Sequence, residues 1–264
     1  MGGWVESEDN LSQDGDCWVD DEACVYGDAK VYHNAQVYDL AEVYGDAWVY
    51  GDAQVCTCAQ VYGHAQVFSR AMVHGYAQVY GRAQVYGRAN VSDHAQVFEQ
   101  ACVSDDATVC DHSQVHGHAW ISQCAMIIDD AEVFQCAYVS GFAMVGGQAE
   151  VLGGARVHGE AQVGGNAQVG GSARVCGNAC IDGDAELRSS DDYMVFKNTW
   201  SSGRWITYTS SDRIWRAGCF RGTGEELIKK AYEDDMRKGK CYEATVRYVE
   251  QIEAIIAGEK KEEP

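Results

Sequence analysis

An aliphatic residue returns at every sixth position from Val19 to Leu187 without interruption. The residue two positions before each of them, from Ala23 to Ala185, is alanine, with Ser113 as the single exception. No helix has a period of six, because an α-helix has 3.6 residues per turn. A short unit repeated at a fixed period indicates a solenoid, in which each repeat packs on its neighbours. This repeat therefore decides the fold of residues 19–187.

The repeating unit reads A-x-V-x-G-x, which predicts a short strand followed by a two-residue turn. Alanine and valine, two positions apart, point to the same side of an extended segment, and the residues beside valine point to the other side. Glycine supplies the positive φ that a sharp corner needs. Three such units close a triangular coil of eighteen residues, so we predict a prism of roughly nine stacked coils, about 45 Å long at about 4.8 Å per coil.

Units such as Ala161-Gln-Val-Gly-Gly-Asn166 resemble those of the hexapeptide-repeat superfamily, whose members form a left-handed parallel β-helix. The resemblance implies the left hand, which the general rule for parallel crossovers would not favour. The superfamily includes trimeric acyltransferases, some carbonic anhydrases, and many bacterial and phage proteins without an assigned role. Because one fold can carry many functions, the fold does not choose among them.

Two further segments flank the repeat. We expect residues 1–18 to form an acidic cap whose apolar residues, Trp4, Val5, Leu11 and Trp18, cover the first coil. Residues 188–264 predict a small α+β domain of order βββαα, with strands near 193–198, 204–209 and 213–220. Its helices should span about 224–237, behind a capping box from Thr223 to Glu226, and about 242–257, with Gly239 ending the first.

Three tryptophans, Trp200, Trp205 and Trp215, are expected to form the core of this C-terminal domain. A role open to the domain is to cap the last coil and present a surface to a protein partner.

The chain has a net charge of −20, and residues 1–187 carry 26 acidic against 6 basic side chains. Such a surface should repel nucleic acid and anionic membranes. Residues 1–18 have no apolar segment of the secretory type, and no stretch reaches membrane-spanning length. The twelve cysteines form no CxxC pair, which favours a reducing cytoplasm over a disulfide or zinc framework. We expect no cofactor.

Aromatic residues recur eighteen positions apart on two faces of the predicted prism. Stacked aromatic rings stabilise neighbouring strands by themselves, but so many rings also leave a large apolar surface. We therefore predict a homo-oligomer, a trimer by the resemblance or a dimer through flat faces. The residues of this interface are Tyr26, Tyr44, Tyr62, Tyr80 and Phe98 on one face, and Tyr32, Tyr50, Phe68 and Tyr86 on the next.

Basic residues of the repeat gather at Arg70, Arg82 and Arg88, with His64 nearby. Beside Tyr62 and Tyr80, these side chains predict a site for a small anion or nucleotide. The alternative is that the arginines neutralise carboxylates of a partner subunit.

The dipeptides Asp93-His94 and Asp111-His112 lie one coil apart at one corner. Carboxylate and imidazole groups at this spacing could hold a divalent metal or act as a general base. Asp and His also suit turns, so the alternative is that these residues only form the corner.

No unit of the repeat is interrupted, so no long loop exists to enclose an acyl donor and exclude water. The sequence thus favours a non-catalytic, oligomeric binding or scaffold protein that sequesters a small anionic ligand. Two alternatives remain open. The first is an acidic mimic of nucleic acid that inhibits a DNA-binding protein, and the second is an acyltransferase-like enzyme in which His112 or His116 would act.

Overall fold

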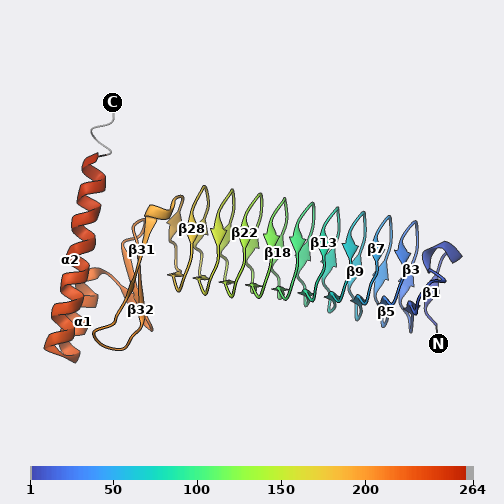
Figure 1. Ribbon diagram of the computed structural model, residues 1–264, viewed down its shortest axis with the longest axis horizontal. Coiled ribbons are helices and arrows are strands. Elements are labelled where there is room, and N and C mark those ends of the chain that lie inside the picture. The colour runs from blue at the N-terminus through green and yellow to red at the C-terminus, as the bar shows by residue number, and fades with distance from the viewer. Residues whose placement is uncertain (1, 260–264) are drawn as a thin grey trace. The chain divides into compact units, whose positions relative to one another are not determined.

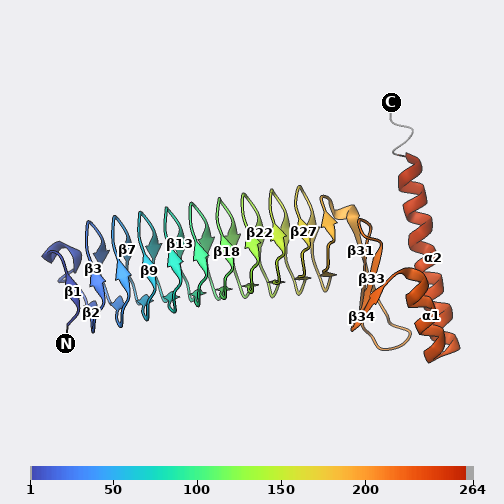
Figure 2. The same cartoon turned by 180° about the vertical axis from the view of Figure 1, so that it is seen from behind.

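The structure, a computed structural model, describes residues 2–259 and divides into two compact units, residues 1–191 and 192–264. The first unit is a parallel β-solenoid, and the second combines an antiparallel sheet with two helices (Figures 1 and 2). Within the described residues, no helix has the length and apolar character needed to cross a membrane.

The solenoid has three parallel sheets, which we call sheets I, II and III in the order in which each full coil visits them, and they contain eleven, nine and ten strands. Sheet I contains β1 (Trp4–Val5), β3 (Cys24–Val25), β6 (Glu42–Val43), β9 (Gln60–Val61), β12 (Gln78–Val79), β15 (Gln96–Val97), β18 (Gln114–Val115), β21 (Glu132–Val133), β24 (Glu150–Val151), β27 (Gln168–Val169) and β30 (Glu186–Leu187). Sheet II contains β4 (Lys30–Val31), β7 (Trp48–Val49), β10 (Gln66–Val67), β13 (Gln84–Val85), β16 (Cys102–Val103), β19 (Trp120–Ile121), β22 (Tyr138–Val139), β25 (Arg156–Val157) and β28 (Arg174–Val175). Sheet III contains β2 (Trp18–Val19), β5 (Gln36–Val37), β8 (Gln54–Val55), β11 (Met72–Val73), β14 (Asn90–Val91), β17 (Thr108–Val109), β20 (Met126–Ile127), β23 (Met144–Val145), β26 (Gln162–Val163) and β29 (Cys180–Ile181).

Strands of the repeat pair in the register that the period of eighteen predicts, as in Gln78 with Gln96 and Val79 with Val97. The valines and alanines of the repeat are buried, nearly all of them completely, and form the column-like core. Ser113, the one substitute for alanine, is buried too, and its hydroxyl donates a hydrogen bond of 2.6 Å to the carbonyl of Cys110. The predicted parallel prism is confirmed.

Each corner begins with a residue of positive φ, which is glycine in most coils and Asp, Glu, Gln, Ser, Thr or His in others. Where this residue is not glycine, its side chain often accepts a hydrogen bond from a backbone N–H of the next coil. Asp129 has φ of 58°, and its carboxylate accepts a hydrogen bond of 2.8 Å from the backbone N–H of Gly147, one coil further on. Glu99 and Asp105 make the same contact with the coil after theirs. These acidic side chains therefore have a structural role at the corner.

The N-terminal segment extends the stack by part of a coil, which includes the 3-10 helix η1 (Glu8–Asn10). The expectation that Trp4 and Trp18 cover the first coil is wrong, since they are 73% and 53% exposed. Both precede the inward residue of their strand, so they take the outward position of the repeat. The buried residue here is Asn10, whose amide donates to the carbonyls of Gly27 and Ala29.

A short 3-10 helix, η2 (Ser190–Asp192), follows the last solenoid strand in the sequence. The second unit has an antiparallel sheet of β31 (Tyr193–Lys197), β32 (Trp205–Thr209), β33 (Ile214–Ala217) and β34 (Phe220–Gly222). The third predicted strand is in fact a hairpin, because Gly218 has φ of 64° and turns the chain between Ala217 and Phe220. Helix α1 (Gly224–Asp234) starts at the predicted capping box of Thr223 and Glu226. Helix α2 follows (Met236–Glu259).

Gly239 does not end a helix, contrary to the prediction, but lies inside α2. The break between the helices is at Asp235, which is extended and whose carboxylate accepts from the backbone N–H groups of Arg237 and Lys238. A Cβ at residue 239 would clash with the ring of Tyr232, so glycine allows α1 and α2 to approach closely. In this unit Trp215 is buried in the core and Trp200 packs against the core cluster, whereas Trp205 is 40% exposed.

Candidate functional site

Three corners and three flat faces make up the outer surface of the solenoid, and outward side chains eighteen residues apart form columns along it. The corner between sheets I and II carries His64 and Arg82, and the corner between sheets II and III carries Arg70 and Arg88. The corner between sheets III and I carries His94 and His112. The predicted site residues are thus distributed over all three corners.

Aromatic side chains on sheets I and II form the two predicted ladders. On sheet I, seven rings stack from Tyr26 to Phe134, with centroids 4.6 to 5.2 Å apart and nearly parallel planes. On sheet II, Tyr32, Tyr50, Phe68 and Tyr86 stack at 4.8 to 4.9 Å. Burial raises the pKa of the Tyr62 and Tyr50 hydroxyls. Since each ring covers the faces of its neighbours, mainly ring edges and hydroxyls reach the surface.

His116 is a member of the sheet I ladder and lies between the rings of Phe98 and Phe134. Its Nε2 is 2.7 Å from Glu132 Oε1, and its Nδ1 is 3.9 Å from Glu99 Oε2. This histidine therefore has two carboxylate neighbours and a place in the stack.

The arginines do not form one cluster. Arg88 Nε lies 2.7 Å from the carboxylate of Asp106, and Arg70 Nε lies 3.8 Å from that of Asp52, both one coil away in the same chain. His64 lies 3.3 Å from Asp46 at the other corner, where Arg82 follows it. Carboxylates of the same chain thus balance the charges of Arg70 and Arg88, and no partner subunit is needed for this.

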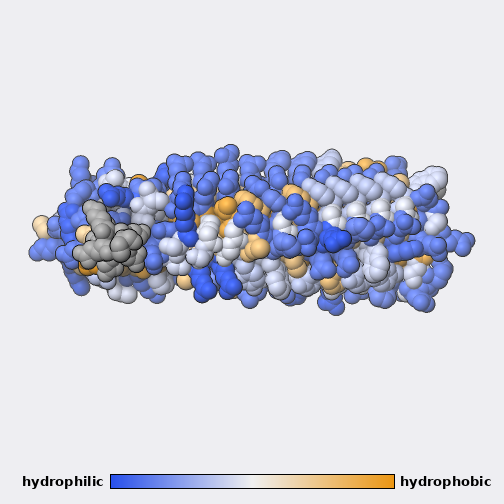
Figure 3. All heavy atoms as spheres, turned by 90° about the horizontal axis from the view of Figure 1, so that it is seen from above, coloured by the Kyte–Doolittle hydropathy of each residue, from blue (hydrophilic) through white to orange (hydrophobic). Residues whose placement is uncertain are grey.

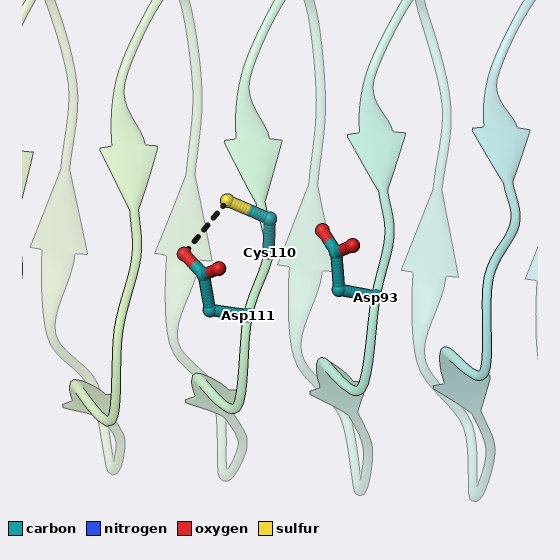
Figure 4. A group of neighbouring side chains, drawn as sticks. All are labelled: Asp93, Cys110 and Asp111. Atoms are coloured by element: carbon teal, nitrogen blue, oxygen red, sulfur yellow. Dashed lines mark hydrogen bonds between the residues drawn. The ribbon is translucent and has the colours of Figure 1, made fainter.

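The aspartates and histidines that the sequence offered as metal ligands also do not come together. The side chains of Asp93, Cys110 and Asp111 converge, each offering a ligand atom within 4.8 Å of the others (Figure 4). The rings of His94 and His112 instead stack on each other and on Tyr76, at 5.0 Å between centroids. The sequence placed the two aspartates together correctly, but it missed Cys110 as their neighbour.

The side chains of the acidic cluster are hydrogen-bonded within the corner. The Cys110 thiol donates to the carboxylate of Asp111 at 3.4 Å, and burial together with this carboxylate raises the pKa of Cys110 to about 12. The same oxygen of Asp111 accepts from the backbone N–H of Asp129, and Asp93 accepts from the Ser92 hydroxyl. These contacts identify the cluster as part of the corner structure.

An open groove of about 640 Å³ runs along the corner between sheets III and I. One wall is the corner column, and the floor is the column of residues that precede valine in sheet I. The wall contains Leu40, Cys58, Tyr76, His94 and His112. The floor contains Glu42, Gln60, Gln78, Gln96 and Gln114. We call this feature the amide groove, and it extends over five successive coils.

Side-chain amides in the amide groove are partly joined to one another. Gln78 donates to Gln60 at 3.2 Å, Gln60 donates to Glu42 at 3.1 Å, and the hydroxyl of Tyr80 donates to Gln96 at 3.3 Å. Each glutamine amide has two donors and can accept two hydrogen bonds, so the ladder leaves capacity for a ligand. The groove thus presents a side-chain amide in each of four successive coils, next to the carboxylate of Glu42 in the coil before them.

Sequence reasoning considered the corner residues His94 and His112 but did not combine them with the adjacent column of glutamines. The available signal was the offset of two residues between the columns 40–112 and 42–114, which places each wall residue beside a floor residue of the same coil.

A comparison of the chain with models of known protein families finds no match, and a comparison with curated proteins finds none either. The candidate site therefore rests on the geometry of this chain.

Proposed function

We propose that this protein is a non-catalytic β-solenoid of the uninterrupted hexapeptide-repeat type that acts as a binding scaffold. The observation that carries the proposal is the amide groove, in which hydrogen-bonding groups repeat along five coils on an open surface. Binding along such a surface needs no loop that encloses the ligand. Free thiols at Cys17, Cys58 and Cys110 support a reducing, cytoplasmic setting.

The ligand that suits the amide groove is an uncharged linear polymer with one hydrogen-bonding unit per coil, for which we propose a neutral glycan. The polar groups of the groove repeat at about 4.8 Å, the spacing of neighbouring strands, whereas an extended peptide advances about 3.3 Å per residue and loses register. One sugar ring is close to one coil in length, and its hydroxyls both donate and accept. The carboxylate of Glu42 in the groove floor disfavours anionic polymers.

A small anion at the arginine patch is less well supported by this arrangement. Two of the three arginines lie near aspartates of their own chain, and Arg82 is at a different corner. Mimicry of nucleic acid is also disfavoured, because residues 53–92 contain no acidic side chain and interrupt the acidic surface.

Retention on an array of immobilised neutral glycans tests the proposal. We expect the parent protein to bind a linear glycan, and Gln78→Lys or Gln96→Lys to weaken binding by about tenfold or more, since a longer charged side chain fills the groove floor. Gln54→Lys is the matched control, because Gln54 holds the same place in the repeat on sheet III.

Equal binding by all of these variants would refute the role of the groove. Retention of extended peptides in place of glycans would refute the ligand class but keep the groove.

A further inference from the structure

The sheet of the second unit is the basic part of a chain whose net charge is −20. Residues 193–222, which contain strands β31 to β34, have five basic side chains and a single acidic one, Asp212. The basic residues are Lys197, Arg204, Arg213, Arg216 and Arg221. Because positive charges gathered in one region attract anions, this sheet is where an anionic ligand is favoured.

A hollow of about 160 Å³ lies beside this sheet and is lined by the β33–β34 hairpin, helix α1 and the start of helix α2. Its charged side chains are Arg204, Lys230 and Asp234. Its other lining residues are Ala217, Cys219, Phe220, Leu227, Ala231 and Tyr242. The hollow thus combines two cations with mainly apolar side chains.

Apolar side chains that line one small space distinguish this hollow from the solenoid surface. On the face of the solenoid in Figure 3, hydrophobic side chains occur as small separate groups among hydrophilic ones. In the hollow, Ala217, Leu227 and Ala231 are at most 9% exposed, and Phe220 packs against the core of the unit. A ligand that fills the hollow therefore needs an apolar part.

Arg204 and Lys230 are available to an anion. Both are exposed, and neither takes part in an ion pair with another of the residues 2–259. Arg204 Nη1 lies 3.0 Å from the point where a Cβ on Gly218 would be, so the glycine of the hairpin turn leaves room for the guanidinium. Lys230 Nζ lies 5.6 Å from the centroid of the Phe220 ring. Both cations thus lie against residues of the hairpin that lines the hollow.

Two further polar groups of the lining are compatible with an anion. The carboxylate of Asp234 lies 3.7 Å from Lys238 Nζ, which offsets its negative charge. Asn198, which is 1% exposed, donates a hydrogen bond of 2.9 Å to the hydroxyl of Tyr242. A tyrosine hydroxyl that accepts a hydrogen bond can also donate one, so Tyr242 offers a neutral donor in addition to the two cations.

We propose that this hollow binds a short aliphatic carboxylate. The guanidinium of Arg204 matches the two oxygens of a carboxylate, Lys230 adds a second positive charge, and the alkyl chain contacts the apolar lining. The chain must be short, because pockets for drug-sized ligands have roughly 300–1,000 Å³ and this hollow is smaller. The site contains no residue of the amide groove, so it does not depend on the glycan.

Titration of sodium butyrate into the full chain, followed by proton–nitrogen NMR correlation spectra, tests the site. We expect saturable shifts in the signals of residues 217–220, 227–231 and 242, because these residues line the hollow. Butyramide keeps the alkyl chain without the charge, and inorganic phosphate keeps a charge without the chain. Both should bind about tenfold more weakly than butyrate or worse.

Exposed residues supply variants that leave the core of the unit intact. Arg204→Gln and Lys230→Gln should each weaken the binding of butyrate about tenfold, as for the loss of a hydrogen bond to a charged group. Arg221→Gln and Lys229→Gln are the matched controls, because they remove the same charges from exposed residues outside the lining. These two variants should bind butyrate like the parent protein.

A peptide chain also ends in a carboxylate, so N-acetyl-alanylalanine is titrated beside butyrate and should bind more weakly, because it is too large for the hollow. The proposal is overturned if butyrate causes no saturable shifts, or if the control variants weaken its binding as much as Arg204→Gln does. Butyramide, phosphate or the dipeptide binding as tightly as butyrate would overturn it as well.

Discussion

Asp129 offers a test of how acidic residues replace glycine at the corners of the solenoid. Its backbone has φ of 58°, and its carboxylate accepts a hydrogen bond of 2.8 Å from the N–H of Gly147. In Asp129→Ala the acceptor is lost, and alanine adopts the positive φ less readily than aspartate, whose short polar side chain suits this region. In Asp129→Gly the acceptor is lost, but glycine adopts the positive φ without a steric penalty.

The magnitudes follow from these two contributions. A hydrogen bond to a charged group contributes about 1.5–3 kcal/mol when buried, and we take about 1 kcal/mol because this one is exposed. An alanine with positive φ costs about 1 kcal/mol more. The free energy of unfolding should therefore fall by about 2 kcal/mol in Asp129→Ala and by about 1 kcal/mol in Asp129→Gly.

Urea unfolding followed by circular dichroism measures both variants beside Asp130→Ala, which removes the same charge at the next residue and should cost little. The reasoning is refuted if Asp129→Ala is as stable as Asp129→Gly, or if Asp130→Ala is as costly as either.

Two further predictions concern the core and a buried thiol. Ile127 is fully buried, so Ile127→Val should lower the unfolding free energy by about 1 kcal/mol and Ile127→Ala by about 3 kcal/mol; equal urea midpoints would contradict the column-like core. The Cys110 pKa is raised to about 12 from 9.0, so the folded state holds this proton more tightly than the unfolded state, and stability should fall as the pH rises from about 9 towards 12. Cys110→Ala should reduce that fall in stability. Alkylation at pH 8 should label the exposed Cys136 well before Cys110. Equal labelling of the two thiols would contradict the partly buried, carboxylate-bonded position of Cys110.

The fold of the solenoid could be read from the sequence because its period specifies every contact. Val79 lies beside Val97, and Tyr62 stacks on Tyr80, as a step of eighteen residues requires. The C-terminal unit has no such period. There the hairpin at Gly218 and the position of Gly239 inside α2 depend on the turn and on the contact with Tyr232, which no local pattern shows.

The candidate site was less predictable, because residues close in sequence can lie at different corners. Arg82 and Arg88 are six residues apart, and that distance moves a side chain from one corner to the next. His94 directly follows Asp93, yet its ring stacks on Tyr76 and His112 while Asp93 approaches Cys110. The amide groove emerges only when two columns are considered together.

Hydrogen–deuterium exchange with and without a retained neutral glycan tests the central proposal, that the amide groove binds a ligand, most directly. Our account predicts slower exchange in the peptides that contain residues 58–60, 76–78 and 94–96, with the outer face of sheet II unchanged by the glycan. Protection on sheet II or III alone, or no protection anywhere, would contradict it.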